Sequence, residues 1–450
     1  MKKLFGTDGI RGLANRDLTP ELALRLGKIF GRMTREKDAG HSRILIGKDT
    51  RLSGGMLEAA VSAGLASQGV DVILAGVIPT PGLAFLTRTL DFTAGLMITA
   101  SHNPAEYNGI KFFSHDGFKI TDQEEFEIEK SIGEFEKIRF QELTGRNLGT
   151  ITRSEVLTTK YLEHLRQVEK TSLNGLRVVL DLANGATFSL APQLVSQLGA
   201  DVISICDKPD GLNINANCGS THLENLQKEV MKHRADVGLA FDGDGDRLLA
   251  VDERGRGLDG DQIILIAARS LARDGKLRNN IVVTTVMSNY GLEEALQKDN
   301  VTVRRTPVGD RYVVEEMMRC GAVLGGEQSG HIIFLDHNTT GDGLITGVKL
   351  LNILKRNGEV LSTLASMNRY PQVQINVRVT NTTNWDHPPR IQTALSNAES
   401  QIRGNGRIIV RASGTEPLIR LMVEGKEITL IEKIAKELAQ RIRAENVKMK

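Results

Sequence analysis

Short apolar runs alternate with longer amphipathic stretches along most of the chain. Apolar runs of about four to eight residues between turn residues predict strands, and the amphipathic stretches predict helices. A helix is expected from Pro20 to about Thr34, because Thr19 can cap its amino end and a proline fits its first turn. The first strands are expected at residues 43–48, 71–75 and 94–100. Such an alternation is typical of α/β proteins.

The same alternation of apolar runs and amphipathic stretches begins again twice, without sequence identity between the repeats. The next strands are expected at 176–182, 201–206 and 237–241, and then at 280–287, 301–305 and 322–325. The last segment has strands at 372–379, 406–411 and 418–423 before a helix rich in Lys and Glu. We therefore expect an α/β fold with three topologically similar α/β domains and a smaller C-terminal α+β domain around a central cleft. The expected domains are 1–150, 151–255, 256–368 and 369–450.

Composition and charge narrow the classes of partner. The 450 residues are 40% hydrophobic and 25% charged, as in soluble globular proteins, and predict two to four domains. Net charge is only +2, from 57 basic and 55 acidic residues spread along the chain, which argues against nucleic acid and membrane surfaces as partners. No apolar run approaches the roughly 18 residues of a membrane span. A small anionic ligand held by a few Arg and Lys side chains stays compatible with these numbers.

The three cysteines indicate a reducing compartment. Cys206, Cys218 and Cys320 are widely spaced, odd in number and without a CxxC pair, which favours free thiols over disulfides or a zinc site. The basic start is followed by Gly6 and polar residues instead of the apolar segment of a signal peptide. We therefore expect a cytoplasmic protein.

Four polar segments, three of which contain glycine, each follow the end of an expected strand. They comprise residues 99–104, 242–247, 326–331 and 411–417. In open α/β sheets, ligands bind outside the carboxyl ends of the strands. One such segment per expected domain predicts that the four meet at one cleft.

The segment from Asp242 to Arg247 predicts a metal site. Its three carboxylates, Asp242, Asp244 and Asp246, are separated by glycines, and oxygen-only ligands favour Mg²⁺ or Ca²⁺. An EF-hand is disfavoured, because Arg247 stands where the calcium loop needs glycine and because the flanks, 237–241 and 248–251, predict strands. A solvated turn is the remaining alternative, but it would not need three acids that repel one another.

The segment TASHNP predicts an exposed, rigidly held hydroxyl at Ser101. A plain polar turn is an equal alternative, and a Ser-His-Asp hydrolase is disfavoured because no G-x-S-x-G elbow surrounds the serine. Neighbouring strand residues face opposite ways, so His102 is expected to be poorly placed as a direct base for Ser101. Lys111 would return to the same site if residues 107–113 form a strand after a turn.

Two other segments predict ligand contacts, and two more carry basic residues among glycines. Residues 411–420 resemble an anion cradle with hydroxyls, glycine amides and two guanidiniums, although a hairpin turn with surface arginines is the alternative. Residues 326–331 offer an acid, an amide, a hydroxyl and an imidazole, which suit a polyhydroxy ligand. Residues 6–12 and 47–51 are basic and glycine-bearing but contain no P-loop, so nucleotide-dependent kinase chemistry is not indicated.

Taken together, these motifs resemble those of the α-D-phosphohexomutases over nearly the whole chain. The matching segments, in order, are FGTDGIRG (5–12), TASHNP (99–104), FDGDGDR (241–247), GEQSGH (326–331) and RASGTEPLIR (411–420). Within the family, Gln328 and residues 213–222, 306–312 and 338–343 are most similar to the bacterial subfamily that acts on glucosamine phosphates.

The resemblance implies a four-domain fold and a role for each matching residue. Ser101 would be a phosphoserine, and it would bind one Mg²⁺ per chain together with Asp242, Asp244 and Asp246. Glu327 and Ser329 would contact the sugar hydroxyls. The substrate phosphate that does not react would be held by Arg411, Ser413, Gly414, Thr415 and Arg420, with Arg11 as a further substrate-binding residue. Candidates for proton transfer and charge stabilisation are Lys111, His102, Arg247 and His331; His102 or Lys111 would act as the base if nearby cations lower its pKa.

The activity implied is the interconversion of glucosamine 6-phosphate and glucosamine 1-phosphate. Glucosamine 1,6-bisphosphate would be the intermediate and activator, and the product would supply UDP-N-acetylglucosamine synthesis. The alternatives are a phosphomannomutase/phosphoglucomutase, a metal-dependent phosphatase, and a non-catalytic sugar-phosphate sensor. The expected partner is a small sugar phosphate, with neither nucleic acid nor membrane, and a homodimer is left open.

Overall fold

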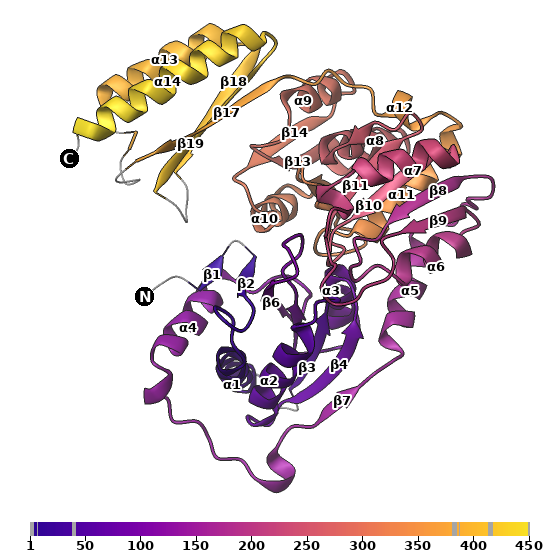
Figure 1. Cartoon of the computed structure of the whole chain (residues 1–450), viewed down its shortest axis with the longest axis vertical. Helices are drawn as coiled ribbons and strands as arrows, with labels where there is room; N and C mark the ends of the chain where they lie inside the picture. The colour runs from indigo at the N-terminus through magenta and orange to yellow at the C-terminus, as the bar shows by residue number, and fades with distance from the viewer. Residues whose placement is uncertain are drawn as a thin grey trace. The chain divides into compact units, whose positions relative to one another are not determined.

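The computed structural model describes residues 4–6, 8–37, 42–379, 385–386, 388–412 and 417–448. The chain divides into two compact units. The first consists of Met1–Thr285 and Val303–Ser366, and the second of Val286–Thr302 and Met367–Lys450. Figure 1 labels most of the strands and helices of the chain.

The first sheet of the first unit has seven strands in the order β1-β2-β6-β5-β3-β4-β7. The strands are β1 (Phe5–Gly6), β2 (Gly9–Leu13), β3 (Arg43–Lys48), β4 (Asp71–Val77), β5 (Ala94–Ile98), β6 (Tyr107–Ser114) and β7 (Ile151–Arg153). The helices are α1 (Pro20–Lys37), α2 (Gly54–Ala66), α3 (Thr80–Thr89) and α4 (Asp122–Gly133), with 3-10 turns η1 (Phe135–Lys137) and η2 (Gly145–Asn147).

Both faces of this sheet are covered, which explains its nearly continuous apolar strands. Ile44 and Ile46 of β3 pack in one cluster with residues of α1 and α2. On the other face, a Cβ placed on Gly47 would lie 2.9 Å from Leu83 of α3. The glycine therefore lets α3, which begins close to the later site, pack directly on the sheet.

Two smaller sheets complete the first unit. The second has the order β12-β11-β10-β8-β9 and the third β14-β13-β15-β16. Their strands are β8 (Arg177–Asp181), β9 (Asp201–Ile205), β10 (Val237–Phe241), β11 (Leu248–Asp252), β12 (Gly257–Leu258), β13 (Ile281–Thr285), β14 (Thr302–Thr306), β15 (Leu324–Gly326) and β16 (Ile332–Phe334). The helices here are α5 (Leu157–Val168), α6 (Leu190–Gln197), α7 (Glu224–His233), α8 (Gly260–Arg273), α10 (Asp310–Cys320), α11 (Gly343–Asn357) and α12 (Leu361–Leu364), with 3-10 turns η3 (Gly219–Thr221) and η4 (Arg278–Asn280).

The three sheets share a four-strand core. Its order is β4-β3-β5-β6 in the first sheet, β9-β8-β10-β11 in the second and β14-β13-β15-β16 in the third. In each, the third strand runs parallel to the second and antiparallel to the fourth. The expectation of three topologically similar α/β domains is therefore confirmed. The turn between the third and fourth strands holds residues 99–106, 242–247 and 327–331, respectively.

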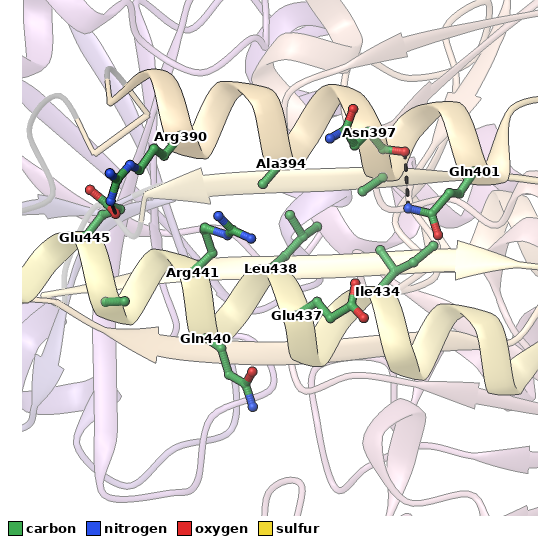
Figure 2. Close-up of a pocket in the computed structure, with 12 residues that line it drawn as sticks. Arg390, Ala394, Asn397, Gln401, Ile434, Glu437, Leu438, Gln440, Arg441 and Glu445 are labelled. Atoms are coloured by element: carbon green, nitrogen blue, oxygen red, sulfur yellow. Dashed lines mark hydrogen bonds and ion pairs between the residues drawn. The ribbon is translucent and has the colours of Figure 1, made fainter.

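The second unit contains a three-stranded antiparallel sheet in the order β17-β19-β18. Its elements are α9 (Tyr290–Lys298), β17 (Gln372–Arg378), α13 (Pro389–Ile402), β18 (Gly406–Ala412), β19 (Leu418–Gly425) and α14 (Ile428–Lys448). Figure 2 shows a groove of about 540 Å³ between α13 and α14, where Arg390 points toward Glu445. The two side chains form a loose ion pair of 3.7 Å. The expected strands at 372–379, 406–411 and 418–423 and the final helix are confirmed.

A buried carboxylate joins three segments of the second unit. Glu424 of β19 has no exposed surface, and it accepts hydrogen bonds from Arg407 Nε at 2.6 Å, Gln372 Nε2 at 2.9 Å and the backbone N–H of Tyr290 at 3.0 Å. A buried ion pair loses much stability when one partner is removed, because the other charge stays buried without compensation.

We therefore expect Glu424→Ala to lower the free energy of unfolding by about 3–5 kcal/mol. The only tryptophan of the sequence, Trp385, packs against the core of this unit, so its fluorescence reports the transition in urea. Glu432→Ala is the control, since Glu432 pairs with Lys436 on the exposed side of α14 and should change stability by less than about 1 kcal/mol. Equal losses in both variants would contradict the role assigned to Glu424.

None of the described helices is long and apolar enough to cross a membrane. The strands expected in the first unit are found within a few residues of their expected bounds. One bound matters later: the strand expected at 94–100 ends at Ile98. Thr99, Ala100 and Ser101 therefore belong to a turn.

Candidate active site

A pocket of about 300 Å³ in the first unit gathers three of the four polar segments expected to meet. His102 comes from the turn after β5, Asp246 and Arg247 from the turn after β10, and Glu327 and His331 from the turn after β15. The remaining lining residues are Gly6, Asp8, Gly9, Arg11, Lys119, Val308, Gly309 and Asp310. The shared four-strand core explains this meeting, because it places each functional turn at the equivalent end of its sheet.

Ser101 adopts a conformation that few residues other than glycine adopt. Its φ is +52°, in the left-handed region. Only 1% of its surface is exposed, so the expectation of an exposed hydroxyl is wrong. Its hydroxyl donates to Asp242 Oδ2 at 2.7 Å, and its backbone N–H donates to Thr99 Oγ1 at 2.9 Å. The turn therefore directs the serine hydroxyl at the predicted metal ligands.

His102 is closer to Ser101 than the sequence predicted. Its Nδ1 lies 3.3 Å from Ser101 Oγ, so the expectation that the two side chains face apart is wrong. The expectation assumed a strand through residue 100, whereas the chain has already left β5 and makes a left-handed turn. Burial, Arg247 and Arg11 lower the pKa of His102 to about 4, so its ring is neutral at pH 7.

The three aspartates lie in a tight turn of a β-hairpin. β10 and β11 pair antiparallel on either side of the turn, so the helices of an EF-hand are absent from these flanks. Asp242, Asp244 and Asp246 are all buried, and carboxylate oxygens of the three lie within 4.8 Å of one another. Burial, followed by the charges of Asp246 and Asp244, raises the pKa of Asp242 well above its usual value.

The oxygen atoms of this turn fit a hard cation. Asp244 Oδ1 and Asp246 Oδ1 are buried and have no hydrogen-bond partner. Unpartnered buried carboxylate oxygens are costly, and a divalent cation would satisfy them. A second group, Asp181 with Cys206 and Cys218, lacks this feature, because Asp181 accepts backbone hydrogen bonds from Ala183 and Gly219 through its two oxygens. The aspartate turn is thus the candidate magnesium site.

Lys111 returns to this site from β6, as predicted, but its charge state differs from the expectation. Its Nζ lies 2.8 Å from Asp244 Oδ2, 3.0 Å from Asp246 Oδ2 and 2.8 Å from Asp8 Oδ2. Burial alone would lower the pKa of Lys111, but these three carboxylates raise it well above its usual value. The lysine is therefore an ammonium ion surrounded by anions, which disfavours it as the base that the sequence allowed.

An ion network not expected from the sequence borders the pocket. Lys119 contacts Asp8, and its Nζ lies 2.5 Å from Asp310 Oδ2. His331 lies 3.4 Å from Asp310 through Nε2, and its Nε2 also accepts the backbone N–H of Gly341 at 3.0 Å. This leaves Nδ1, 3.6 Å from Asp246 Oδ1, as the protonated nitrogen. Asp8 and Asp310 stood inside motifs already noted, whereas nothing in the local sequence marked Lys119.

The remaining predicted residues differ in position. Arg11 donates to Asn103 Oδ1 at 3.4 Å, and Glu327 Oε1 accepts the backbone N–H of Gly309 at 3.3 Å, so both are held at the pocket wall. Burial would lower the pKa of Arg247, but the charges of Asp242 and Asp246 raise it above its usual value. Ser329 is exposed and does not line the pocket.

The predicted phosphate cradle lies in the second unit. Arg411 of β18 and Arg420 of β19 are directly paired across the antiparallel strands. Burial, together with the charge of Arg420, lowers the pKa of Arg411. Two guanidiniums on neighbouring strands suit an anion. Ser413, Gly414 and Thr415 fall outside the described residues.

Comparison with known proteins supplies the family. The models of phosphoglucomutase/phosphomannomutase match in order: alpha/beta/alpha domain I at residues 2–139, domain II at 159–256, domain III at 259–370 and the C-terminal domain at 375–441. A phosphoglucosamine mutase of Desulforamulus reducens is 51% identical over 443 residues, covering 98% of this chain and 99% of its own.

Solved structures agree in fold. A phosphoglucomutase/phosphomannomutase family protein of Burkholderia thailandensis has a TM-score of 0.82 at 26% identity, covering 99% of this chain and 98% of its own. The N-acetylphosphoglucosamine mutase of Aspergillus fumigatus, solved with GlcNAc-6P and magnesium, has a TM-score of 0.65 at 19% identity, covering 98% of this chain and 96% of its own. The chain therefore belongs to the phosphoglucomutase/phosphomannomutase family, the phosphohexomutases that its motifs resembled.

Proposed function

We propose that this chain interconverts glucosamine 6-phosphate and glucosamine 1-phosphate, with Ser101 as the carrier of the phosphoryl group. The observation that carries the proposal is the contact between Ser101 Oγ and Asp242 Oδ2, at 2.7 Å, beside two buried carboxylate oxygens without hydrogen-bond partners. The preference for glucosamine rests on the phosphoglucosamine mutase with which the chain shares 51% of its residues. The cytoplasmic location expected from the sequence is part of this proposal.

Two phosphoryl transfers account for the reaction. Phospho-Ser101 gives its phosphoryl group to the O1 hydroxyl of glucosamine 6-phosphate, which yields the 1,6-bisphosphate and a free serine hydroxyl. The bisphosphate then turns in the pocket, and its 6-phosphoryl group passes to Ser101 Oγ, which leaves glucosamine 1-phosphate. Atoms balance over the cycle, because Ser101 gives one phosphoryl group in the first transfer and regains one in the second.

The surrounding side chains match the charges of this cycle. A phosphoserine carries about −1.5 to −2 charges at pH 7, and Arg11, Lys119 and Arg247 line the pocket that would receive it. His102 is neutral and lies 3.3 Å from Ser101 Oγ, so its ring can take up the proton that a hydroxyl releases on attack. Glu327 is held at the wall, where it can accept hydrogen bonds from the sugar.

Asp242, Asp244 and Asp246 would hold Mg²⁺ together with the serine phosphate. When bound, the ion would offset the charge of the phosphoryl group and orient it. Arg411 and Arg420 would bind the phosphate that is not reacting, and they must accept either end of the bisphosphate. These roles agree with those that the family resemblance implied.

The substrate preference is tested by comparing kcat/KM for the 6-phosphates of glucosamine, glucose and mannose. We expect glucosamine to be favoured by roughly tenfold to a hundredfold, because the C2 hydroxyl of the other sugars reproduces only part of the hydrogen bonding of the amino group. Equal kcat/KM values would contradict the glucosamine preference but would not bear on the proposed phosphoserine mechanism. Steady release of inorganic phosphate without isomerisation would instead indicate a phosphatase.

A further inference from the structure

The turn that carries Ser101 is held by a buried arginine from a distant loop. Arg51 lies between β3 and α2, and its side chain has no exposed surface. Its Nη2 donates to the carbonyl oxygens of Ser101 at 2.9 Å and Asn103 at 2.8 Å. Its Nη1 donates to the carbonyl of Tyr107 at 3.0 Å and to that of Pro104. One guanidinium therefore donates to four carbonyl oxygens in the turn and at the start of β6.

A side chain from the segment between β9 and η3 binds the same two carbonyls. Asn215 Nδ2 lies 2.9 Å from the carbonyl oxygen of Ser101 and 3.0 Å from that of Asn103. The backbone N–H of Asn215 in turn donates to Ala183, just beyond β8, at 2.9 Å. Gly243 permits this approach, because a Cβ there would lie 2.6 Å from Ser101 O and 2.8 Å from Asn215 Nδ2.

A third chain of hydrogen bonds fixes the amide side of the serine. Arg51 Nε donates to Asp49 Oδ2 at 2.9 Å, and Thr99 Oγ1 donates to the same oxygen at 2.6 Å. The backbone N–H of Ser101 then donates to Thr99 Oγ1 at 2.9 Å. The carbonyl of Ser101 is thus bound by Arg51 directly, and its N–H is linked to Arg51 through Thr99 and Asp49.

Such support has a specific reason. A non-glycine residue in the left-handed region is disfavoured and persists only where its surroundings hold it. The conformation is what directs Ser101 Oγ at Asp242, and misplacement of a reacting group by about 1 Å can slow a reaction a hundredfold.

We propose that Arg51 and Asn215 are positioning residues for the phosphoryl-carrying serine: together they hold the Ser101 turn in its left-handed conformation. Arg51 fixes the turn from within its own domain, and Asn215 ties it to the sheet that bears the three aspartates. The proposal rests on the proposed function of Ser101. It adds that the alignment of Ser101 with the three aspartates depends on the side-chain amide of Asn215, which comes from outside the first sheet and its helices.

The test compares Asn215→Ala and Arg51→Lys with Thr50→Val in the full-length enzyme. Thr50 is the matched control, because its hydroxyl also crosses to the second sheet, to Asn184 O at 2.5 Å, but does not contact the Ser101 turn. We expect Asn215→Ala to lower kcat about tenfold to a hundredfold with KM within about threefold of wild type. Arg51→Lys should lower kcat further, since an ammonium lacks the fork that reaches several carbonyls. Thr50→Val should change kcat less than about twofold.

The kcat and KM values separate positioning from general damage. Circular dichroism and thermal unfolding are recorded for each variant, and Asn215→Ala carries the test if Arg51→Lys does not fold. Incorporation of phosphate at Ser101 from the bisphosphate, followed by intact mass, should be slowed in the same proportion as kcat. If Asn215→Ala keeps wild-type kcat while Ser101→Ala is inactive, the positioning role is wrong and the proposed function stands. If Ser101→Ala is active, the proposed function itself fails.

Discussion

Replacement of Ser101 by alanine is expected to reduce mutase turnover by roughly 10⁴-fold or more. Removing the group that forms a covalent intermediate removes the whole two-step route, and such losses are far larger than those of supporting residues. The hydroxyl is buried and contacts both Asp242 and His102, so no other hydroxyl occupies its place. Turnover is measured with a coupled assay for glucosamine 1-phosphate.

Intact mass provides the second measurement for this variant. Wild-type protein should lose the mass of one phosphoryl group on phosphatase treatment, and Ser101→Ala should show no such loss. Ser114→Ala at the end of β6 is the control, because Ser114 hydrogen-bonds to Asp116 and Phe118 O and does not line the candidate active site. Near wild-type turnover in Ser101→Ala would end the phosphoserine proposal.

Asp244→Asn is expected to lower kcat/KM roughly a hundredfold or more and to abolish stabilisation by magnesium. The substitution keeps the size of a fully buried side chain but removes a charge from the three carboxylates. A ligand that binds only the folded state stabilises it, by about 2.7 kcal/mol at a hundredfold excess over Kd. Wild-type protein should therefore show a Tm that rises with Mg²⁺, and the variant should show no rise.

The control for this variant lies at the other end of the same strand. Asp236 precedes β10, whereas the three aspartates of the candidate metal site follow it. Asp236 accepts the backbone N–H of Arg177 at 2.7 Å. Asp236→Asn should keep the full response of Tm to Mg²⁺. A response in Asp244→Asn equal to that of wild type would show that the metal binds elsewhere.

Local patterns predicted what depends on local sequence. The buried strands β3, β8 and β10 appear as apolar runs because both faces of a parallel strand are covered. The three turns that carry the candidate site residues stand out because polar residues appear where such runs end, next to glycine in two of the three turns. The candidate metal ligands Asp242, Asp244 and Asp246 stand out in the sequence for the same reason, since they occupy every second position of one turn.

Contacts between distant segments could not be predicted in this way. Lys119 meets Asp310 across 191 positions, and Asn215 meets Ser101 across 114, so only the packing of the domains brings them together. The contact between Ser101 and His102 was missed for another reason: a strand and a left-handed turn look alike in the sequence TASHNP, yet they direct neighbouring side chains differently. The charge of Lys111 depends on Asp8, Asp244 and Asp246, which lie outside the strand that carries the lysine.

The positive φ of Ser101 limits which amino acids this position can accept. Threonine also carries a hydroxyl, but a branched Cβ is a genuine outlier in the left-handed region. Tyrosine would need space that a residue with 1% exposure does not have. Glycine suits the backbone and lacks the hydroxyl. The identity of the proposed carrier residue is therefore constrained twice during divergence of the family, once by its chemistry and once by the conformation of the chain, and even exchange for threonine is disfavoured.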